Sequence, residues 1–285
     1  MLKLDRACIE QAIGFFSEGV SPFPHALVTA FDRVGPEAGS RSHLLAEAFP
    51  GTQQASEMQA LAHAFQRVSS RFLQPLTRME LLDWMRRELL ESNGSQWSRF
   101  AALAIKDFHV DLAGLMDSIA PVILLGCNVP LTDLPGFADL QTSGSRRAKE
   151  FRSRLPASVL QAVDASDRWW SPVKRIRKLI IHGDLRTVVY GGPANGILFQ
   201  AYEPQHVPKI LDPAFVWMPG KNVVDFRRYS ACVLAELIVF LDRLGIALAE
   251  RMGKRPDDLA LSMLWGDFTN LLASMRELLG VEARG

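Results

Sequence analysis

The sequence has few cysteines and almost no net charge, and each of these shortages excludes a class of protein. Its 285 residues include only three cysteines, which lie far apart and lack the Cys-x-x-Cys spacing of zinc and redox sites. Each lies in an apolar segment, so we expect buried thiols in a reducing compartment: Cys8, Cys127 and Cys232. The formal net charge of +1 argues against a protein that coats nucleic acid over its whole surface.

Long hydrophobic runs are also missing. The first twenty residues are interrupted by charged side chains at positions 5, 6, 10 and 18, so the sequence predicts no signal peptide. The longest apolar runs, at 119–127 and 232–241, are too short or too interrupted by charge to span a bilayer. We therefore expect a soluble, cytoplasmic protein with no membrane partner.

The sequence contains no internal repeat, and most of it follows a helical period. Apolar side chains recur three or four residues apart at 53–75, 97–119, 226–244 and 261–278. These four segments predict long amphipathic helices.

Local signals predict where some helices begin and end. A capping box at 77–80 predicts a helix that begins there and runs to Leu90. Pro121 should kink or end the helix that contains it. The pair Ser171-Pro172 predicts the start of a helix that continues to about His182.

The predicted β content is small. Two β-rich runs flank the glycine-rich turn GGPANG, which predicts a hairpin at about 186–203. Turn-forming residues at 91–95 form the candidate domain boundary. The sequence thus predicts a mainly α protein, with an N-terminal helical region at 1–94 and a helical bundle at 95–285 that carries the hairpin.

Charge is unevenly distributed along the chain. Between Arg146 and Arg186 there are eleven Lys or Arg residues and four acids, a local excess of seven positive charges. Arg177 and His182 lie in this stretch, near the end of a predicted helix. Imidazole transfers protons near neutral pH and guanidinium matches phosphate oxygens, and cleavage of RNA without a metal needs both functions.

The spacing of these two residues bears on oligomeric state. On an ideal helix they are separated by about 140° around the axis and roughly 7.5 Å along it, so a single helix presents a loose site. A two-fold axis would bring two such sets together.

The run from Arg177 to His182, with HGD and the later segment VVDFRRYSACVLAEL, resembles the R-x4-6-H motif region of HEPN domains over about 96–250. The family pattern often has asparagine after the arginine, where this sequence has Lys178. The resemblance implies a helical bundle that is frequently dimeric. It also implies a metal-independent endoribonuclease of a toxin or defence system, or a relative that binds RNA, nucleotides or protein without cleavage.

The resemblance also implies roles for residues and partners. His182 would be the acid or base and Arg177 the stabiliser of phosphate and transition state, with no metal or cofactor. RNA, a second copy of the chain, and an antitoxin or other protein are the expected partners. Three basic residues would form an edge that holds phosphates: Arg175, Lys178 and Arg186. Trp169 and Trp170 either stack on unpaired bases or pack in the core.

A purely structural role remains open for several of these residues. Arg177 and His182 in a last helical turn would oppose the helix dipole without any further function. Asp107 and Asp111 either orient His182 or form ion pairs. The remaining histidines lack the spacing of a metal site.

Two alternative functions come from different classes of protein. HGDL at 182–185, NGILF and ILDP follow the order of motifs in aminoglycoside phosphotransferases, with Asp184 as base and Asn195 and Asp212 as metal ligands. However, Asn195 lies eleven residues after Asp184 instead of five, and residues 1–95 are expected to be helices and loops rather than a β-lobe. The second alternative is a non-catalytic helical interaction module.

Overall fold

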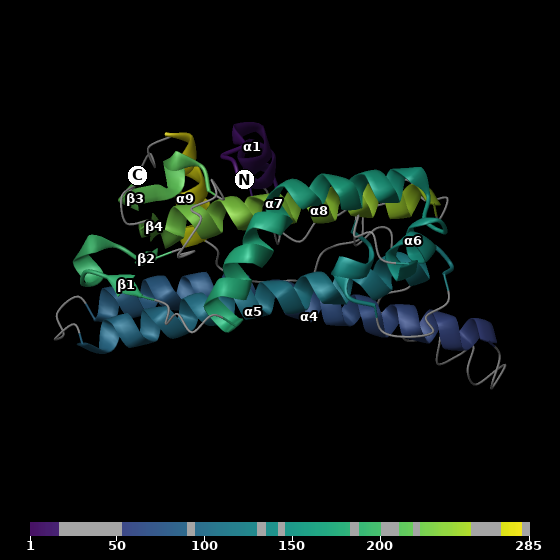
Figure 1. Ribbon diagram of the computed structural model, residues 1–285, viewed down its shortest axis with the longest axis horizontal. Helices are drawn as coiled ribbons and strands as arrows, with labels where there is room; N and C mark the ends of the chain where they lie inside the picture. The colour runs from purple at the N-terminus through teal and green to yellow at the C-terminus, as the bar shows by residue number, and fades with distance from the viewer. Residues whose placement is uncertain are drawn as a thin grey trace.

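The computed structural model confirms a mainly α fold with a small antiparallel sheet (Figure 1). It describes these residues: 1–16, 53–89, 95–129, 135–141, 146–182, 188–200, 211–218, 223–251 and 269–280.

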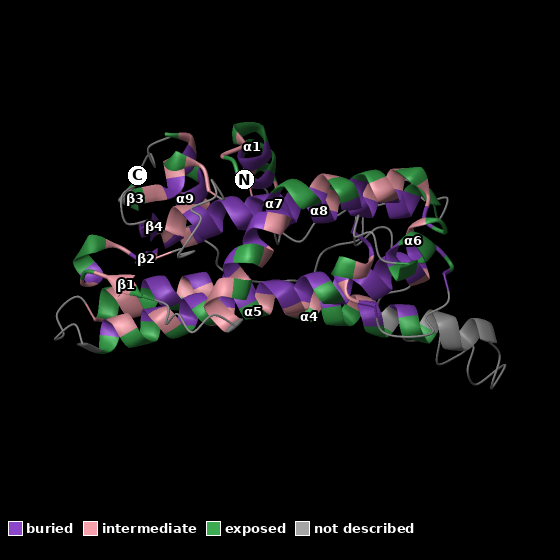
Figure 2. Ribbon diagram, viewed as in Figure 1, coloured by how far each residue is buried: buried purple, intermediate pink, exposed green. Residues whose placement is uncertain are grey.

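Two layers of long helices make up most of the molecule (Figure 1). In one layer, α4 (Gln53–Glu88) and α5 (Ser95–Gly126) pack antiparallel to each other. In the other, α7 (Ala157–His182) packs on α8 (Phe226–Arg251). Buried residues face the space between the layers and exposed residues lie on the outer sides (Figure 2).

Shorter helices cover the two ends of α8. At the amino end, α1 (Arg6–Gly14) and α9 (Thr269–Leu279) pack on α8 and on each other. At the far end of the α7–α8 layer, α6 (Arg146–Arg152) contacts the short 3₁₀ helix η1 (Phe137–Asp139).

The sheet has four short strands in the order β1-β2-β4-β3. The predicted hairpin is confirmed: β1 (Val189–Tyr190) pairs with β2 (Leu198–Gln200), and the 3₁₀ helix η2 (Pro193–Asn195) lies in the turn between them. The other two strands, β3 (Val216–Met218) and β4 (Val223–Asp225), were not expected from the sequence. β4 leads directly into α8, so the sheet fixes the amino end of the central helix.

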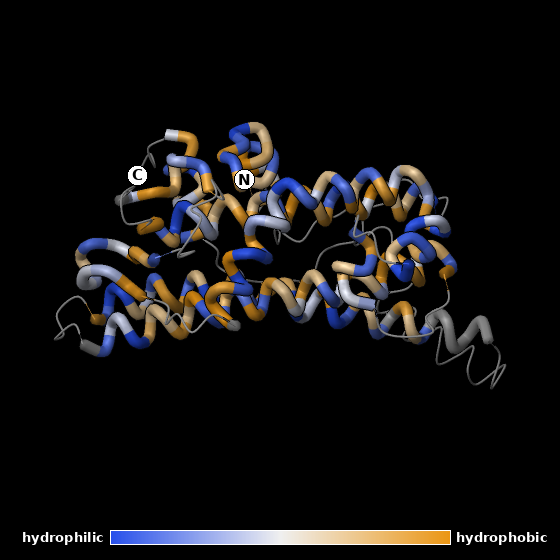
Figure 3. The backbone as a smooth tube through the Cα atoms, viewed as in Figure 1, coloured by the Kyte–Doolittle hydropathy of each residue, from blue (hydrophilic) through white to orange (hydrophobic). Residues whose placement is uncertain are grey.

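One hydrophobic core includes residues from both sides of the predicted boundary. Phe72 and Leu76 of α4 belong to the same buried cluster as Phe108 and Leu112 of α5. Apolar and polar segments alternate along each helix (Figure 3), as expected for helices buried on one side. The predicted boundary therefore separates two helices that share a core.

The helix starts predicted at 77–80 and at Ser171 are wrong, because each lies inside a longer, continuous helix. Three prolines also lie inside continuous helices. α4 runs through Pro75 and past the predicted start at 77–80, and α7 runs through Pro172. α5 continues past Pro121 to Gly126. Burial of the apolar faces of these helices against the core outweighs the hydrogen bond that each proline removes.

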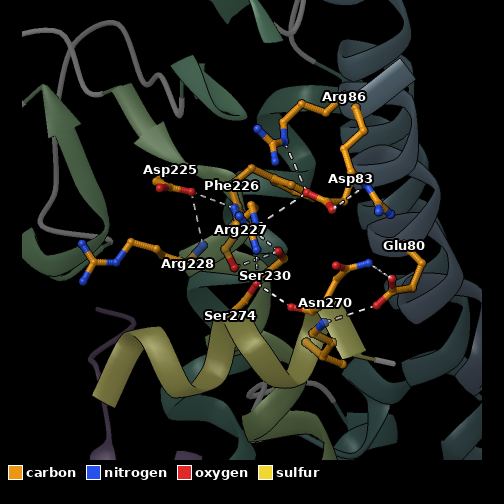
Figure 4. A network of polar contacts seen from close by, with 12 residues as sticks. Glu80, Asp83, Arg86, Asp225, Phe226, Arg227, Arg228, Ser230, Asn270 and Ser274 are labelled. Atoms are coloured by element: carbon orange, nitrogen blue, oxygen red, sulfur yellow. Dashed lines mark hydrogen bonds and ion pairs between the residues drawn. The ribbon is translucent and has the colours of Figure 1, made fainter. Parts of the chain in front are cut away.

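The expected capping box stabilises a different helix. The carboxylate of Glu80, on α4, accepts a hydrogen bond from the Leu271 backbone N–H at 3.2 Å and another from the side-chain amide of Asn270 (Figure 4). Both donors lie in the first turn of α9, so Glu80 binds groups that the start of this helix leaves unpaired.

A charged cluster next to Glu80 connects α4 with α8 (Figure 4). The buried carboxylate of Asp83 lies 3.3 Å from Arg86, 3.6 Å from Arg87 and 3.9 Å from Arg227. The Arg227 side chain also donates to the Ser274 hydroxyl of α9 at 3.2 Å. Asp83 thus joins α4 to α8 by ion pairs, and Arg227 extends the connection to α9 by a hydrogen bond.

One helix in the described part of the chain is long and apolar enough to cross a membrane, by length and composition alone. It is α5 from Gln96 to Gly126, and 72% of its most apolar window is buried inside the molecule. Such burial is typical of the core helix of a soluble protein, and the fold is compatible with one.

Candidate functional site

The carboxyl-terminal half of α7 carries the predicted site. α7 bends partway along its length, where Pro172 cannot donate to the preceding turn, and its second half crosses toward α5 (Figure 1). Val173 and Ile176 are buried on this half, and Ile180 packs against the core. Because this stripe faces the core, the other side chains of the last two turns point away from it.

Arg177 lies half-buried on this segment. Its Nε is buried, and no hydrogen-bond acceptor among the described residues reaches it. An unpaired buried donor on a charged group costs about 1–3 kcal/mol or more. An anion that reached this guanidinium would remove that cost.

His182 is the last residue of α7. Its side chain lies outside the described residues, as do residues 183–187, which include Asp184 and Arg186. The convergence of Arg177 and His182 therefore stays a prediction.

The predicted basic edge is present in part. Lys178 and Arg175 are exposed on the last turns of α7, and Arg175 already takes part in other interactions. Arg186 is the member of the predicted edge that lies outside the described residues.

Base stacking by the two tryptophans is not supported. Trp169 and Trp170 are both buried, contact each other edge to face with centroids 5.8 Å apart, and Trp169 also contacts Phe240. Both indoles belong to the core between α7 and α8, so neither offers a free face to a base. Their positions just before Pro172 place them on the buried side of the helix.

Four of the eleven cations of the 146–186 stretch form ion pairs within the protein. Arg152 forms a bidentate pair with Asp164 at 2.7 and 2.9 Å. Arg168 contacts Glu236 at 2.9 Å and Asp5 at 3.1 Å. Weaker or more exposed pairs hold two further arginines: Arg147 with Asp139 and Arg154 with Glu150.

The remaining cations of this stretch divide into two groups. Lys174 donates to the Gln141 side chain at 2.9 Å. Within the described part of the chain, four others have neither an acidic partner nor a side-chain hydrogen bond: Arg146, Lys149, Arg177 and Lys178. The first two of these lie on α6 and the last two near the end of α7. The free positive charge is therefore concentrated at two places, one of which is the predicted site.

Asp107 and Asp111 form ion pairs, the second of the two roles that the sequence left open for them. Arg78 of α4 lies 3.0 Å from Asp111 and 3.8 Å from Asp107. These contacts join α4 to α5 and account for both carboxylates without His182.

The phosphotransferase alternative finds no support in the described residues. Asp212 caps the short 3₁₀ helix η3 (Pro213–Phe215) by accepting from Ala214 N at 2.9 Å. The side chain of Asn195 accepts from Gly192 N at 3.1 Å within the hairpin turn. The described parts of the first 95 residues are helical apart from one bridge between Leu2 and Leu211, so they contain no β-lobe.

A buried histidine that sequence reasoning did not single out lies at the centre of the core. Nδ1 of His109 donates to the Ile105 carbonyl at 2.7 Å, and Nε2 accepts from the Tyr229 hydroxyl at 3.0 Å. Burial lowers the pKa of His109 to about 4. A neutral imidazole with both nitrogens hydrogen-bonded has a structural role. The sequence indicated only that His109 lies one helical turn after Ile105.

The three cysteines are buried and free, as predicted. Burial raises the pKa of the Cys127 thiol to about 11 and raises the pKa values of Cys8 and Cys232 well above the ordinary range. In the part of the chain that is described, no group of three or more His, Cys, Asp or Glu side chains is placed to hold a metal ion.

Comparison of the chain with models of protein families, with curated proteins and with solved structures found no match. The HEPN resemblance therefore rests on the residues from Arg177 to His182 and on the segments that follow them.

Proposed function

We propose that the protein is a HEPN-like, metal-independent endoribonuclease or RNA-binding relative whose site lies at the carboxyl end of α7. The observation that carries the proposal is the Nε of Arg177, which is buried and has no acceptor among the described residues. Arg177 also forms no ion pair within that part of the chain, so its charge remains available to a phosphate.

The proposed chemistry divides between two side chains. The ribose 2′-oxygen attacks phosphorus while His182 removes the 2′-hydroxyl proton, and the bond from phosphorus to the 5′-oxygen breaks. Arg177 stabilises the negative charge that develops on the phosphoryl oxygens. The products are a 2′,3′-cyclic phosphate and a 5′-hydroxyl, whose oxygen must receive a proton.

This proton balance favours a dimer. One chain offers one imidazole in the predicted motif, whereas the reaction needs a base at the 2′-oxygen and an acid at the 5′-oxygen. A second copy related by a two-fold axis would supply the other group. The family often has asparagine at the position where this chain has Lys178. Because of this difference from the family motif, RNA binding without cleavage is the alternative outcome.

The test is cleavage of a mixed-sequence RNA in EDTA by the wild type and by His182→Ala and Arg177→Ala. We expect losses of about 10²-fold or more for removal of the acid–base group, and of similar size for the charge-stabilising group. Arg154→Ala is the matched control, because this arginine lies in the same basic stretch but is paired with Glu150 at 2.9 Å. Equal cleavage by all four proteins, or none by the wild type, would remove the catalytic role.

Filter binding of the same RNA separates the remaining alternatives. Binding by the wild type that weakens in Arg177→Ala, without cleavage, would identify an RNA-binding relative. No binding and no cleavage would favour the non-catalytic interaction module.

A further inference from the structure

The outer face of the α4–α5 layer carries exposed apolar side chains that the proposed nuclease site does not use. Leu81 and Trp84 of α4 are 38% and 52% exposed. Phe100, Leu103 and Val110 of α5 are 45%, 56% and 42% exposed. We refer to these five side chains as the α4–α5 patch.

The helix spacing places these side chains on one surface. Leu81 and Trp84 are three residues apart, and the three residues of α5 are spaced by three and seven, so each set lies on one face of its helix. Arg78 contacts Asp107 and Asp111, and the helices are antiparallel. Residues that follow Arg78 on α4 therefore lie beside residues that precede Asp107 on α5. This brings Leu81 and Trp84 close to Phe100 and Leu103, with Val110 two turns further along α5.

The apolar character is confined to this end of the layer. Figure 2 shows exposed residues along the outer side of α4 and α5. On α4 the exposed positions between the first turns and Leu81 are polar: His63, Gln66, Arg67, Ser70, Gln74 and Thr77. A local change from a polar face to an apolar one marks a docking surface rather than ordinary scattered exposure.

The side chains of the patch are between 38% and 56% exposed, and none of them lines a groove given by the described residues, which limits the kinds of partner. A protein partner is usually anchored by side chains that enter pockets. A groove of about 350 Å³ lies instead between α7 and α8 and is lined by Ala162, Ala165 and Arg243, among others. An exposed set of Trp, Phe and Leu is suited to insertion into a soft, apolar layer.

The charges around the patch favour an anionic partner. Arg99 and Lys106 are exposed beside it, and Arg87 is also exposed but lies 3.6 Å from Asp83. Among the described residues of these turns, Glu88 is an exposed acid. The acids at 107 and 111 are held by Arg78 on the side toward α4. A second copy docked through the same face would bring the two cationic edges together, so the charge argues against self-association here.

Both a membrane and single-stranded RNA are anionic, and the aliphatic residues separate them. RNA would use the rings of Trp84 and Phe100 but gain little from Leu81, Leu103 and Val110. A bilayer surface buries all five, while the cations contact lipid head groups. We propose that the α4–α5 patch binds the surface of an anionic membrane.

This inference is independent of the nuclease proposal. It departs from the sequence-based expectation of no membrane partner, which considered only segments that span a bilayer.

The experiment is sedimentation of the full chain with vesicles of phosphatidylcholine mixed with phosphatidylserine, compared with vesicles of phosphatidylcholine alone. The wild type should bind the anionic vesicles more tightly, and salt should weaken this binding. The double variant Trp84→Ser/Leu103→Ser should lower the partition coefficient by about tenfold or more, because two inserted side chains are lost. Arg99→Gln/Lys106→Gln should lower it on the order of tenfold through lost head-group attraction.

Trp217→Ser is the matched control, because Trp217 is 55% exposed on β3, outside the α4–α5 layer. It should bind as the wild type does. Quenching of tryptophan fluorescence by brominated lipid gives a second readout in the folded protein, and Trp84→Phe should remove most of it.

Several results would overturn the proposal. One is a wild type that does not sediment with anionic vesicles, and another is a Trp84→Ser/Leu103→Ser variant that binds them unchanged. A change in oligomeric state or in affinity for single-stranded RNA, with vesicle binding unaffected, would assign the patch to a second copy or to RNA instead.

Discussion

Several buried polar side chains in this protein are paired with specific partners, and His109 is the clearest case. Its two ring nitrogens are bonded to Ile105 and Tyr229, and its ring stacks on that of Tyr229 with centroids 5.6 Å apart. Protonation would give Nε2 a hydrogen where it now accepts one from the tyrosine. The pair therefore holds only while the imidazole is neutral.

His109 should make the protein sensitive to acid. Its folded pKa of about 4 lies below the ordinary value of 6.5, so the unfolded chain binds the proton first as pH falls. Its contribution is fully present above pH 6.5 and is lost as pH falls toward 4, by on the order of 3 kcal/mol in total. Urea unfolding at successive pH values across this window measures the slope.

The variant His109→Phe should flatten this slope. It should also lower stability at neutral pH by about 1–3 kcal/mol, because the Tyr229 hydroxyl loses its acceptor. Exposed His63→Phe is the control and should leave the slope unchanged. A slope in His109→Phe as steep as that of the wild type would contradict the assignment.

At the scale of elements, the sequence predicted which long segments are helical, but it did not predict several of the helix ends. Helical periodicity at 53–75 and 97–119 corresponds to α4 and α5, because one face of each had to be apolar to meet the core. The ends at 77–80 and at Ser171 failed because capping and proline signals are worth about 1–3 kcal/mol each, less than the burial that continues each helix. Strands β3 and β4 have three residues each, too few to show a period of two. β1 and β2 are as short, and they were predicted from the glycine-rich turn GGPANG between them.

The role of Glu80 can be tested, because its carboxylate accepts hydrogen bonds from the first turn of α9 rather than capping α4. Glu80→Ala should destabilise α9 by about 1 kcal/mol and speed hydrogen exchange of the Leu271 amide several-fold. Glu88→Ala, an exposed acid of the same helix, should leave that exchange rate unchanged. If Glu80 instead caps its own helix, the faster exchange would occur within α4.

At the scale of the whole molecule, the two regions expected at 1–94 and 95–285 share one buried cluster. α1 packs on α8 and α9, and the Leu2 carbonyl accepts from Asp212 N at 2.8 Å. The amino-terminal region therefore contacts the later bundle at both ends of its described residues.

The shared core predicts one unfolding transition. Urea unfolding followed by far-UV circular dichroism and by tryptophan fluorescence should give coincident curves, because Trp97, Trp169 and Trp170 lie in a single cluster. A chain of residues 95–285 alone should show no cooperative transition, since the apolar face of α5 would lose α4. Two separated transitions in the full chain would instead indicate two domains with a boundary at residue 94.

The sequence by itself determined the helical class, the buried cysteines and the hairpin at 189–200, because each depends on short-range periodicity or turn chemistry. The tertiary structure decided which charges stay free. Arg152 and Arg168 are neutralised by ion pairs with Asp164 and Glu236. The charge of Arg177 has no such partner among the described residues. The structure also decided that Trp169 and Trp170 are buried and Trp84 is exposed. Partners far apart in sequence set these outcomes, and no local pattern contains them.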